Sequence, residues 1–147
     1  MTDKIFLASD HGGVILKDKI QNYLKSKKVD VTDLGPDLNV SVDYPDYAQK
    51  LTTEVLKSTG SRGILICGTG IGMSIAANKV DNIRATLVWN EFTAKMSREH
   101  NNSNVLVLGE RVLNHDRALD YVDIWMRTEF GGDRHQKRLD KISKLEK

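Results

Sequence analysis

The sequence predicts an α/β fold in which helices cover both faces of a parallel sheet. Short apolar runs, typical of buried strands, alternate along the chain with segments whose apolar residues recur at helical spacing. Strands that are joined through helices in this way lie parallel, and such sheets are covered on both faces. A length of 147 residues, with 39% hydrophobic and 29% charged residues, suits one domain over residues 1–147.

Strands are predicted where a short apolar run ends at glycine, proline or a polar cluster. The first run, for example, stops at the polar, glycine-containing segment 10–13, and the second is closed by Gly35-Pro36. The predicted strands are, in chain order, Lys4–Ser9, Asp30–Leu34, Gly63–Ile66, Arg84–Trp89 and Val105–Leu108.

Helices are predicted where apolar residues recur every three or four positions between charged ones. In the first of these segments, Leu16, Ile20 and Leu24 share this spacing and lysines lie between them. Gly131-Gly132 separates the last two helices, and the final helix is highly charged. The predicted helices are 14–27, about 47–57, a segment after the third strand through Asn78, 91–99, about 115–127 and 134–146.

Composition and charge argue against several classes of function. The formal net charge of +2 is too small to favour binding to nucleic acid or to a membrane surface. No apolar run reaches the length of a membrane span, and the N-terminus lacks the apolar core of a signal peptide. Cys67 is the only cysteine, so no internal disulfide can form and a reducing, cytoplasmic setting is expected.

Polar clusters follow three of the predicted strands where each strand ends. They are Ser9-Asp10-His11, the segment from Cys67 to Gly72, and Gly109-Glu110-Arg111. Ligands of parallel α/β sheets collect outside the carboxyl ends of the strands. We therefore expect a binding or catalytic site at this edge of the sheet, although the order of the strands cannot be derived from the sequence.

The segment from Cys67 to Gly72 has the pattern C-G-x-G-x-G. A dinucleotide fingerprint or a Cys-x5-Arg loop would need glycine or arginine where Met73 stands, and the Lys-Ser/Thr pair of a P-loop is absent. Two interpretations remain: the loop amides bind a small anion or polar substrate, or the glycines only allow tight packing. Cys67 is likewise either a reactive thiol beside a helix N-terminus or a buried core residue.

Other polar residues are less specific candidates. Asp10 either orients the imidazole of His11 or caps the following helix. His100 lies at a polar helix end, where a solvated histidine would be ordinary. Arg134 and Arg138 lie four positions apart on one helix face, so they either bind an anion together or form a solvated basic face. The histidines and the single cysteine match no zinc spacing, so no metal site is predicted.

Four segments together resemble the type B ribose-5-phosphate isomerases, which form one sugar-phosphate isomerase family with the galactose-6-phosphate isomerase subunits. These segments are 8–13, 66–72, 97–101 and 131–138, and the resemblance covers essentially the whole chain. It implies a Rossmann-like three-layer sandwich with a five-stranded parallel sheet and a C-terminal helix. It also implies a homodimer or dimer of dimers, no metal or other cofactor, and interconversion of ribose 5-phosphate and ribulose 5-phosphate in the non-oxidative pentose phosphate pathway.

The resemblance also implies roles for individual residues. Cys67 would be the base that moves a proton between C2 and C1, and His100 the acid–base group that opens the furanose ring. One branch of the family has a glutamate base at the position of Met73, so this chain resembles the cysteine branch. The substrate-binding residues would be Asp10 and His11 at the sugar, the amides of Gly68, Thr69, Gly70, Ile71 and Gly72 at the enediolate with Asn101 nearby, and Arg111, Arg134 and Arg138 at the phosphate.

The position of His100 predicts active sites that span two subunits. His100 ends a helix of about 15 Å that runs back toward the amino ends of the strands, away from Cys67. If both residues serve one site, that site must cross the interface of a two-fold dimer. Two alternative functions stay open: isomerisation of a six-carbon sugar phosphate (allose 6-phosphate or galactose 6-phosphate), and a flavodoxin-like module that binds a nucleotide or flavin without catalysis.

Overall fold

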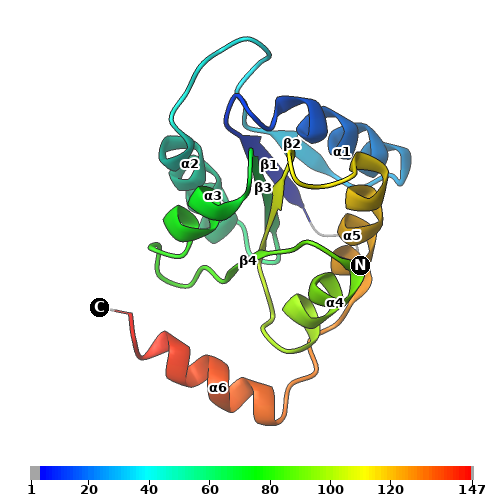
Figure 1. Cartoon of the computed structure of the whole chain (residues 1–147). Helices are drawn as coiled ribbons and strands as arrows, with labels where there is room; N and C mark the ends of the chain where they lie inside the picture. Colours follow the sequence, from blue (N-terminus) through cyan, green and yellow to red (C-terminus); the bar gives the residue numbers. More distant parts are fainter. Residues whose placement is uncertain (1–3, 147) are drawn as a thin grey trace.

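The computed structural model describes residues 4–146 and confirms a sheet of five parallel strands (Figure 1). Their order across the sheet is β2-β1-β3-β5-β4. The first predicted strand starts one residue later and the third extends to Cys67. The strands are β1 (Ile5–Ser9), β2 (Val31–Asp33), β3 (Arg62–Cys67), β4 (Ala85–Leu87) and β5 (Val105–Gly109).

The described residues form six helices, and five of them, α1 to α5, complete the predicted three-layer α/β sandwich (Figure 1). The side chains of α1, α4 and α5 contribute to the core on one face of the sheet, and those of α2 and α3 to the core on the other. None of these six helices has the length and apolarity to span a membrane. The helices are α1 (Val14–Ser26), α2 (Tyr44–Lys57), α3 (Ile71–Ala77), α4 (Glu91–Glu99), α5 (His115–Arg127) and α6 (Arg134–Ser143).

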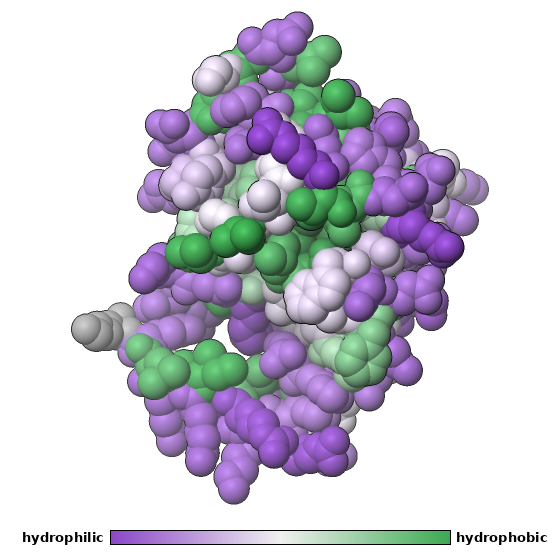
Figure 2. Space-filling view, viewed as in Figure 1, coloured by the Kyte–Doolittle hydropathy of each residue, from purple (hydrophilic) through white to green (hydrophobic). Residues whose placement is uncertain are grey.

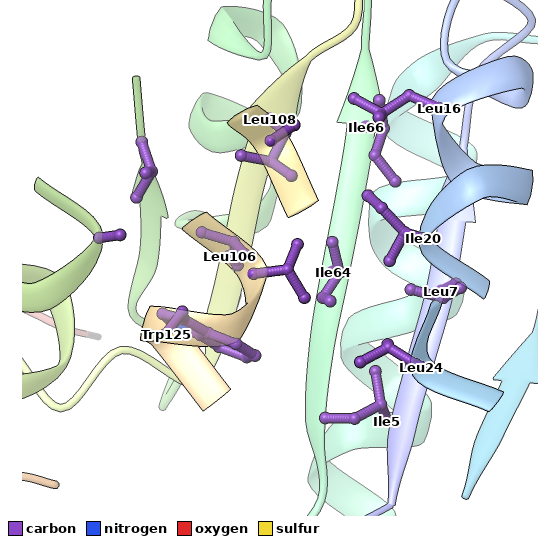
Figure 3. Packing of buried hydrophobic residues seen from close by; sticks show 14 residues of the cluster. Ile5, Leu7, Leu16, Ile20, Leu24, Ile64, Ile66, Leu106, Leu108 and Trp125 are labelled. Carbon is purple, nitrogen blue, oxygen red and sulfur yellow. The ribbon is translucent and has the colours of Figure 1, made fainter. Parts of the chain in front are cut away.

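Alternation along the central strands decides which side chains face which helices. Ile64 and Ile66 of β3 pack with the apolar side of α1 and with Trp125 of α5 (Figure 3). Leu65 and Cys67 point to the opposite face, into the core beneath α2 and α3. Cys67 is therefore presented on the α2–α3 side of the sheet, at the end of a strand that is buried on both faces.

Two further predicted boundaries differ in the structure, each for a local reason. α2 begins at Tyr44 and not near Tyr47, because Pro45 fits the first helical turn, where no amide partner is needed. β4 covers only the middle of the predicted strand 84–89. It is an edge strand, and its pairing with β5 extends over the three residues 85–87.

The C-terminal helix α6 lies apart from the two helical layers (Figure 1). It ends at Ser143, before the predicted Glu146, because the chain turns there and the amide of Leu145 donates to the carbonyl oxygen of Ile142. A hollow of about 720 Å³ separates α6 from the segment 78–86, and apolar side chains line its α6 wall (Figure 2). The exposed part of this wall, Ile142 of α6 and Leu145 just after it, is an apolar surface that faces the hollow and the segment 78–86.

The strand order brings the three predicted polar clusters together. β3 lies between β1 and β5, so the loops that follow these three strands are neighbours at one edge of the sheet. The chain also reverses its direction across the sheet at the β1–β3 pair, the place where parallel sheets open a crevice for ligands.

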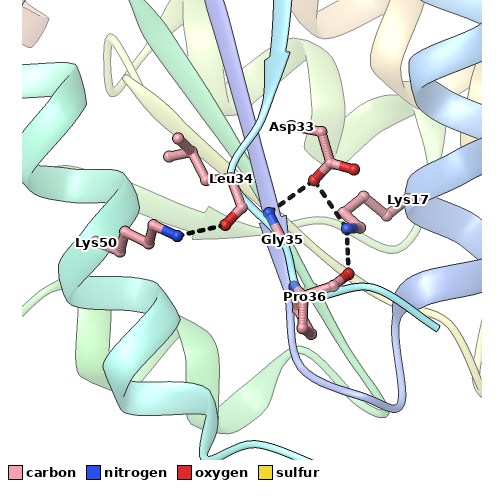
Figure 4. Close-up of polar contacts among 6 residues, drawn as sticks. All are labelled: Lys17, Asp33, Leu34, Gly35, Pro36 and Lys50. Atoms are coloured by element: carbon pink, nitrogen blue, oxygen red, sulfur yellow. Dashed lines mark hydrogen bonds and ion pairs between the residues drawn. The ribbon is translucent and has the colours of Figure 1, made fainter. Parts of the chain in front are cut away.

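A buried lysine fixes the loop that follows β2. Lys17 of α1 is 1% exposed, and its Nζ donates to Asp33 Oδ1 and to the carbonyl oxygen of Pro36, both at 2.8 Å (Figure 4). The same carboxylate oxygen accepts the amide of Gly35 at 2.8 Å. One amine therefore ties α1, the end of β2 and the start of the long loop together.

We expect Lys17→Ala to lower the free energy of unfolding by about 3 kcal/mol, because Asp33 would lose its buried partner. Urea unfolding measures this change. Lys19→Ala, at an exposed position of the same helix, is the matched control and should change stability by less than about 0.5 kcal/mol. Equal stability of the two variants would show that the Lys17 contacts contribute nothing net.

Candidate active site

Cys67 stands at the centre of the carboxyl edge, with its side chain 6% exposed. Its Sγ accepts a hydrogen bond from the amide of Gly70 at 3.1 Å. Gly70 has a φ of 81°, a left-handed conformation that glycine adopts without strain and that turns the chain into α3. An amide donor and the start of a helix therefore lie directly beside the sulfur.

The glycine loop also contains helix-start amides. The amide of Ile71 donates to the hydroxyl of Thr69 at 3.2 Å, which closes the loop on itself. The next amides, those of Gly72 and Met73, have no acceptor within their own helix because they belong to its first turn. Preorganised amides beside a thiol suit a reaction in which a base removes a proton from a carbon atom and negative charge develops on a neighbouring oxygen.

We expect Gly70→Ala to lower kcat at least tenfold with a folded enzyme. A Cβ at this position would lie 2.5 Å from Leu87 Cδ1 and 3.2 Å from the backbone carbon of Leu108, and the positive φ would be strained. The loop must shift, and a displacement of about 1 Å from productive geometry costs up to about 10²-fold in rate. Steady-state kinetics with circular dichroism checks this, and wild-type kcat would show that the loop geometry is dispensable.

Arg111 lies against the Cys67 loop. The amides of Glu110 and Arg111 donate to the carbonyl oxygens of Cys67 and Gly68, both at 2.9 Å, and so join the β5 loop to the β3 loop. A Cβ on Gly68 would lie 3.2 Å from Arg111 Nη1, and one on Gly12 would lie 3.4 Å from Nη2. The guanidinium is thus held between the β1 and β3 loops.

Neither sequence interpretation of Asp10 describes its contacts. Its Oδ1 accepts the amide of Gly12 at 2.9 Å, which orders the loop, whereas the cap of α1 is Gly13 without a side-chain hydrogen bond. His11 is oriented instead by the long loop, because its Nδ1 lies 3.2 Å from the carbonyl oxygen of Val42. His11 is exposed at the same edge as Cys67.

Tyr44 is a site candidate that the sequence analysis missed. A Cβ on Gly72 would lie 2.6 Å from the Tyr44 ring, so this ring packs directly on the glycine loop. Tyr44 is 39% exposed at the start of α2. A sequence signal could have identified Tyr44: proline favours the first turn of a helix, so Pro45 places Tyr44 at the helix start.

The other predicted residues form a second cluster. His100, Asn101, Arg134 and Arg138 line a pocket of about 430 Å³ together with His135. The rings of His100 and His135 are stacked, with centroids 4.1 Å apart and planes 18° apart. The cluster joins the end of α4 to the first turns of α6, two segments that are distant in the sequence.

The two clusters lie at opposite edges of the sheet. Cys67 pairs with Gly109, the last residue of β5. Asn101 lies at the amino edge, because Arg84, which precedes β4, donates through Nε to its carbonyl oxygen at 3.1 Å. The length of β5 between these edges is about 13 Å. Within one chain, Arg111 accompanies Cys67, whereas Arg134 and Arg138 accompany His100.

The second cluster is electropositive. Partial burial lowers the pKa of His135, and the charges of His100, Arg134 and Arg138 lower it further, while Glu99 opposes them. A histidine in these surroundings is neutral at neutral pH. The pocket thus combines two guanidinium groups with two stacked imidazole rings.

Among residues 4–146, no three His, Cys, Asp or Glu side chains are gathered closely enough to hold a metal ion. The groups that the two clusters contain are a thiol, imidazoles, backbone amides and guanidinium groups. These groups suit proton transfer and the binding of an anionic substrate.

Comparison with known proteins agrees with this description. Residues 5–142 match the model of the Ribose/Galactose Isomerase family. Ribose-5-phosphate isomerase B of Escherichia coli is 42% identical over 143 residues, which cover 97% of this chain and 96% of that protein.

Two solved structures are also similar. Ribose-5-phosphate isomerase B of Clostridium thermocellum has a TM-score of 0.93 and 51% identity, covering 97% of this chain and 96% of the other. The enzyme of Mycoplasma genitalium, solved with bound ribulose-5-phosphate, has a TM-score of 0.93 and 44% identity over 99% and 97% of the two chains. On the family match and these identities, the chain belongs to the ribose/galactose isomerase family.

Proposed function

We propose that this protein interconverts ribose 5-phosphate and ribulose 5-phosphate by general acid/base catalysis through an enediolate. The observation that carries the proposal is Cys67, whose sulfur is held by the Gly70 amide in a loop of helix-start amides. The names of the relatives favour this substrate pair. The proposed enzyme is one domain over residues 1–147, of which 1–3 and 147 lie outside the described residues, and its expected setting is the cytoplasm.

Cys67 is the proposed base. As a thiolate it takes the proton from C2 of the open-chain aldose and returns it to C1. One proton also passes from the hydroxyl on C2 to the oxygen on C1, so that the carbonyl group moves from C1 to C2. The negative charge that develops on the enediolate oxygens is stabilised by loop amides, and each such donor is worth about 3–4 kcal/mol where it has been measured. Met73 cannot replace Cys67 as a base, because its thioether binds no proton and its side chain is fully buried.

The proposed active unit is a two-fold dimer, alone or within a dimer of dimers. One chain holds Cys67 and His100 at opposite edges, but two chains related by a two-fold axis can bring the Cys67 edge of each against the His100 edge of the other. Large apolar side chains near the glycine loop support an interface there, since exposed apolar surface marks contact sites. They are Ile71, Ile75, Trp89 and Phe92, between 55% and 69% exposed.

In this dimer, residues of both chains hold one substrate. Arg111 of the Cys67 chain and the pair Arg134 and Arg138 of the other chain bind the phosphate, as guanidinium groups bind phosphate oxygens in a charge-assisted way. Asp10, His11 and Asn101 contact the sugar. His100 opens the furanose ring before proton transfer at Cys67.

Substrate competition tests this function. We expect the pure protein to convert ribose 5-phosphate with a kcat/KM at least tenfold above the values for allose 6-phosphate and galactose 6-phosphate. A preference for either six-carbon sugar would keep the chemistry and change the substrate. Activity on none of the three sugars would contradict the proposal and favour a binding module without catalysis.

A further inference from the structure

The imidazole of His135 covers one face of His100. We propose that His135 is a positioning residue for His100, fixing by ring stacking the plane in which His100 transfers protons during ring opening. The stack joins ring centroids 4.1 Å apart with an interplanar angle of 18°. The inference rests on the proposed function, because it assigns a role within the ring-opening step.

The rings of His100 and His135 come from different segments of the chain, which the fold brings together. His100 is the C-cap of α4, and its amide donates to the carbonyl oxygen of Met96 at 2.9 Å. The amide of Gly131 donates to the carbonyl oxygen of Glu99 at 2.9 Å and ties the segment before α6 to the end of α4. A Cβ on Gly131 would lie 3.1 Å from that carbonyl oxygen and 3.6 Å from His135 Cδ2, so this close approach favours glycine.

Ring opening explains why the plane of His100 matters. The C1–O4 bond breaks and C1 becomes a carbonyl, while one proton leaves the hydroxyl on C1 and one proton joins O4. An imidazole that serves both oxygens must present its ring nitrogens in the plane of these two positions. His100 lies at a helix end, where its side chain would otherwise choose among rotamers, and a stacked ring restricts that choice.

The electrostatics favour stacking by a neutral His135. Burial and the charges of His100, Arg134 and Arg138 lower the pKa of His135, whereas the charge of Glu99 opposes them. A neutral ring can remain stacked while His100 gains and loses its proton, whereas two imidazolium rings would repel each other. The alternative role for His135 is a third phosphate contact beside Arg134 and Arg138.

Two variants separate these roles. His135→Ala removes the stack, and His135→Phe keeps a flat ring but removes every hydrogen bond and charge. We expect kcat on ribose 5-phosphate to fall about tenfold in His135→Ala with KM changed less than twofold, and His135→Phe to restore most of kcat, because positioning acts on the reacting geometry. Gln136→Ala, at an exposed neighbouring position, controls for perturbation of α6.

An isotope effect assigns the loss to its step. With ribose 5-phosphate deuterated at C2, the effect on kcat/KM in His135→Ala should equal or fall below that of the wild type, since ring opening becomes the slower step. A larger isotope effect, a raised KM with unchanged kcat, or a His135→Phe variant no better than His135→Ala would overturn the positioning role. An inactive wild-type protein would instead refute the proposed function itself.

Discussion

Cys67→Ala is expected to abolish isomerisation, with a loss in kcat of about 10²–10⁴-fold, because the variant has no base at C2. Binding should survive, since the phosphate contacts lie on Arg111, Arg134 and Arg138 and not on the thiol. Calorimetric titration with ribulose 5-phosphate should therefore give a Kd within a few-fold of the wild type. Steady-state kinetics on ribose 5-phosphate measures the loss of turnover.

Two controls separate catalysis from folding. Cys67→Ser keeps a small polar group that can accept the Gly70 hydrogen bond at 3.1 Å, but a hydroxyl is a far weaker base than a thiolate, so this variant should also be inactive. Val55→Ala removes apolar volume from the same core cluster away from the loop, and it should lose stability while retaining turnover. A Cys67→Ala enzyme that keeps most of its kcat would remove Cys67 from the reaction.

Local sequence patterns were sufficient to predict the helices, the strands and the edge of the sheet at which the polar clusters lie. The clusters at Asp10, Cys67 and Arg111 follow strands, and parallel strands place such clusters at one edge whatever their order. The order itself needed the structure, because inserting β5 between β3 and β4 depends on packing across the whole sheet. The predicted start of α2 near residue 47 was too late, because the preference of proline for a first helical turn places the start at Tyr44, just before Pro45.

Contacts between segments that are distant along the chain could not be predicted from the sequence. Lys17 resembles the other lysines of α1, and only the fold shows that its amine is buried on Asp33 and Pro36. His135 has no pattern of its own, and its role appears only when α6 brings it onto His100. Both cases depend on tertiary packing, which spacing along one helix does not describe.

Mixing two inactive variants should restore activity if the active sites are composite. In a dimer that pairs a Cys67→Ala chain with a His100→Ala chain, one site carries both lesions and the other carries none. Random reassortment of equal amounts should therefore recover about one quarter of wild-type activity, and a purified heterodimer about one half. Kinetics on ribose 5-phosphate, with a different affinity tag on each chain, measures this recovery.

A second heterodimer distinguishes composite active sites from active sites that lie within one chain, because the two arrangements predict opposite results. A wild-type chain paired with a chain that carries both Cys67→Ala and His100→Ala has one lesion in each composite site, so this heterodimer should be inactive. If each site lay within a single chain, the same heterodimer would keep one intact site and about half of the wild-type activity. The heterodimer of a Cys67→Ala chain and a His100→Ala chain would then recover no activity. Because Cys67 and His100 lie at opposite ends of β5, we expect the composite outcome in both pairings.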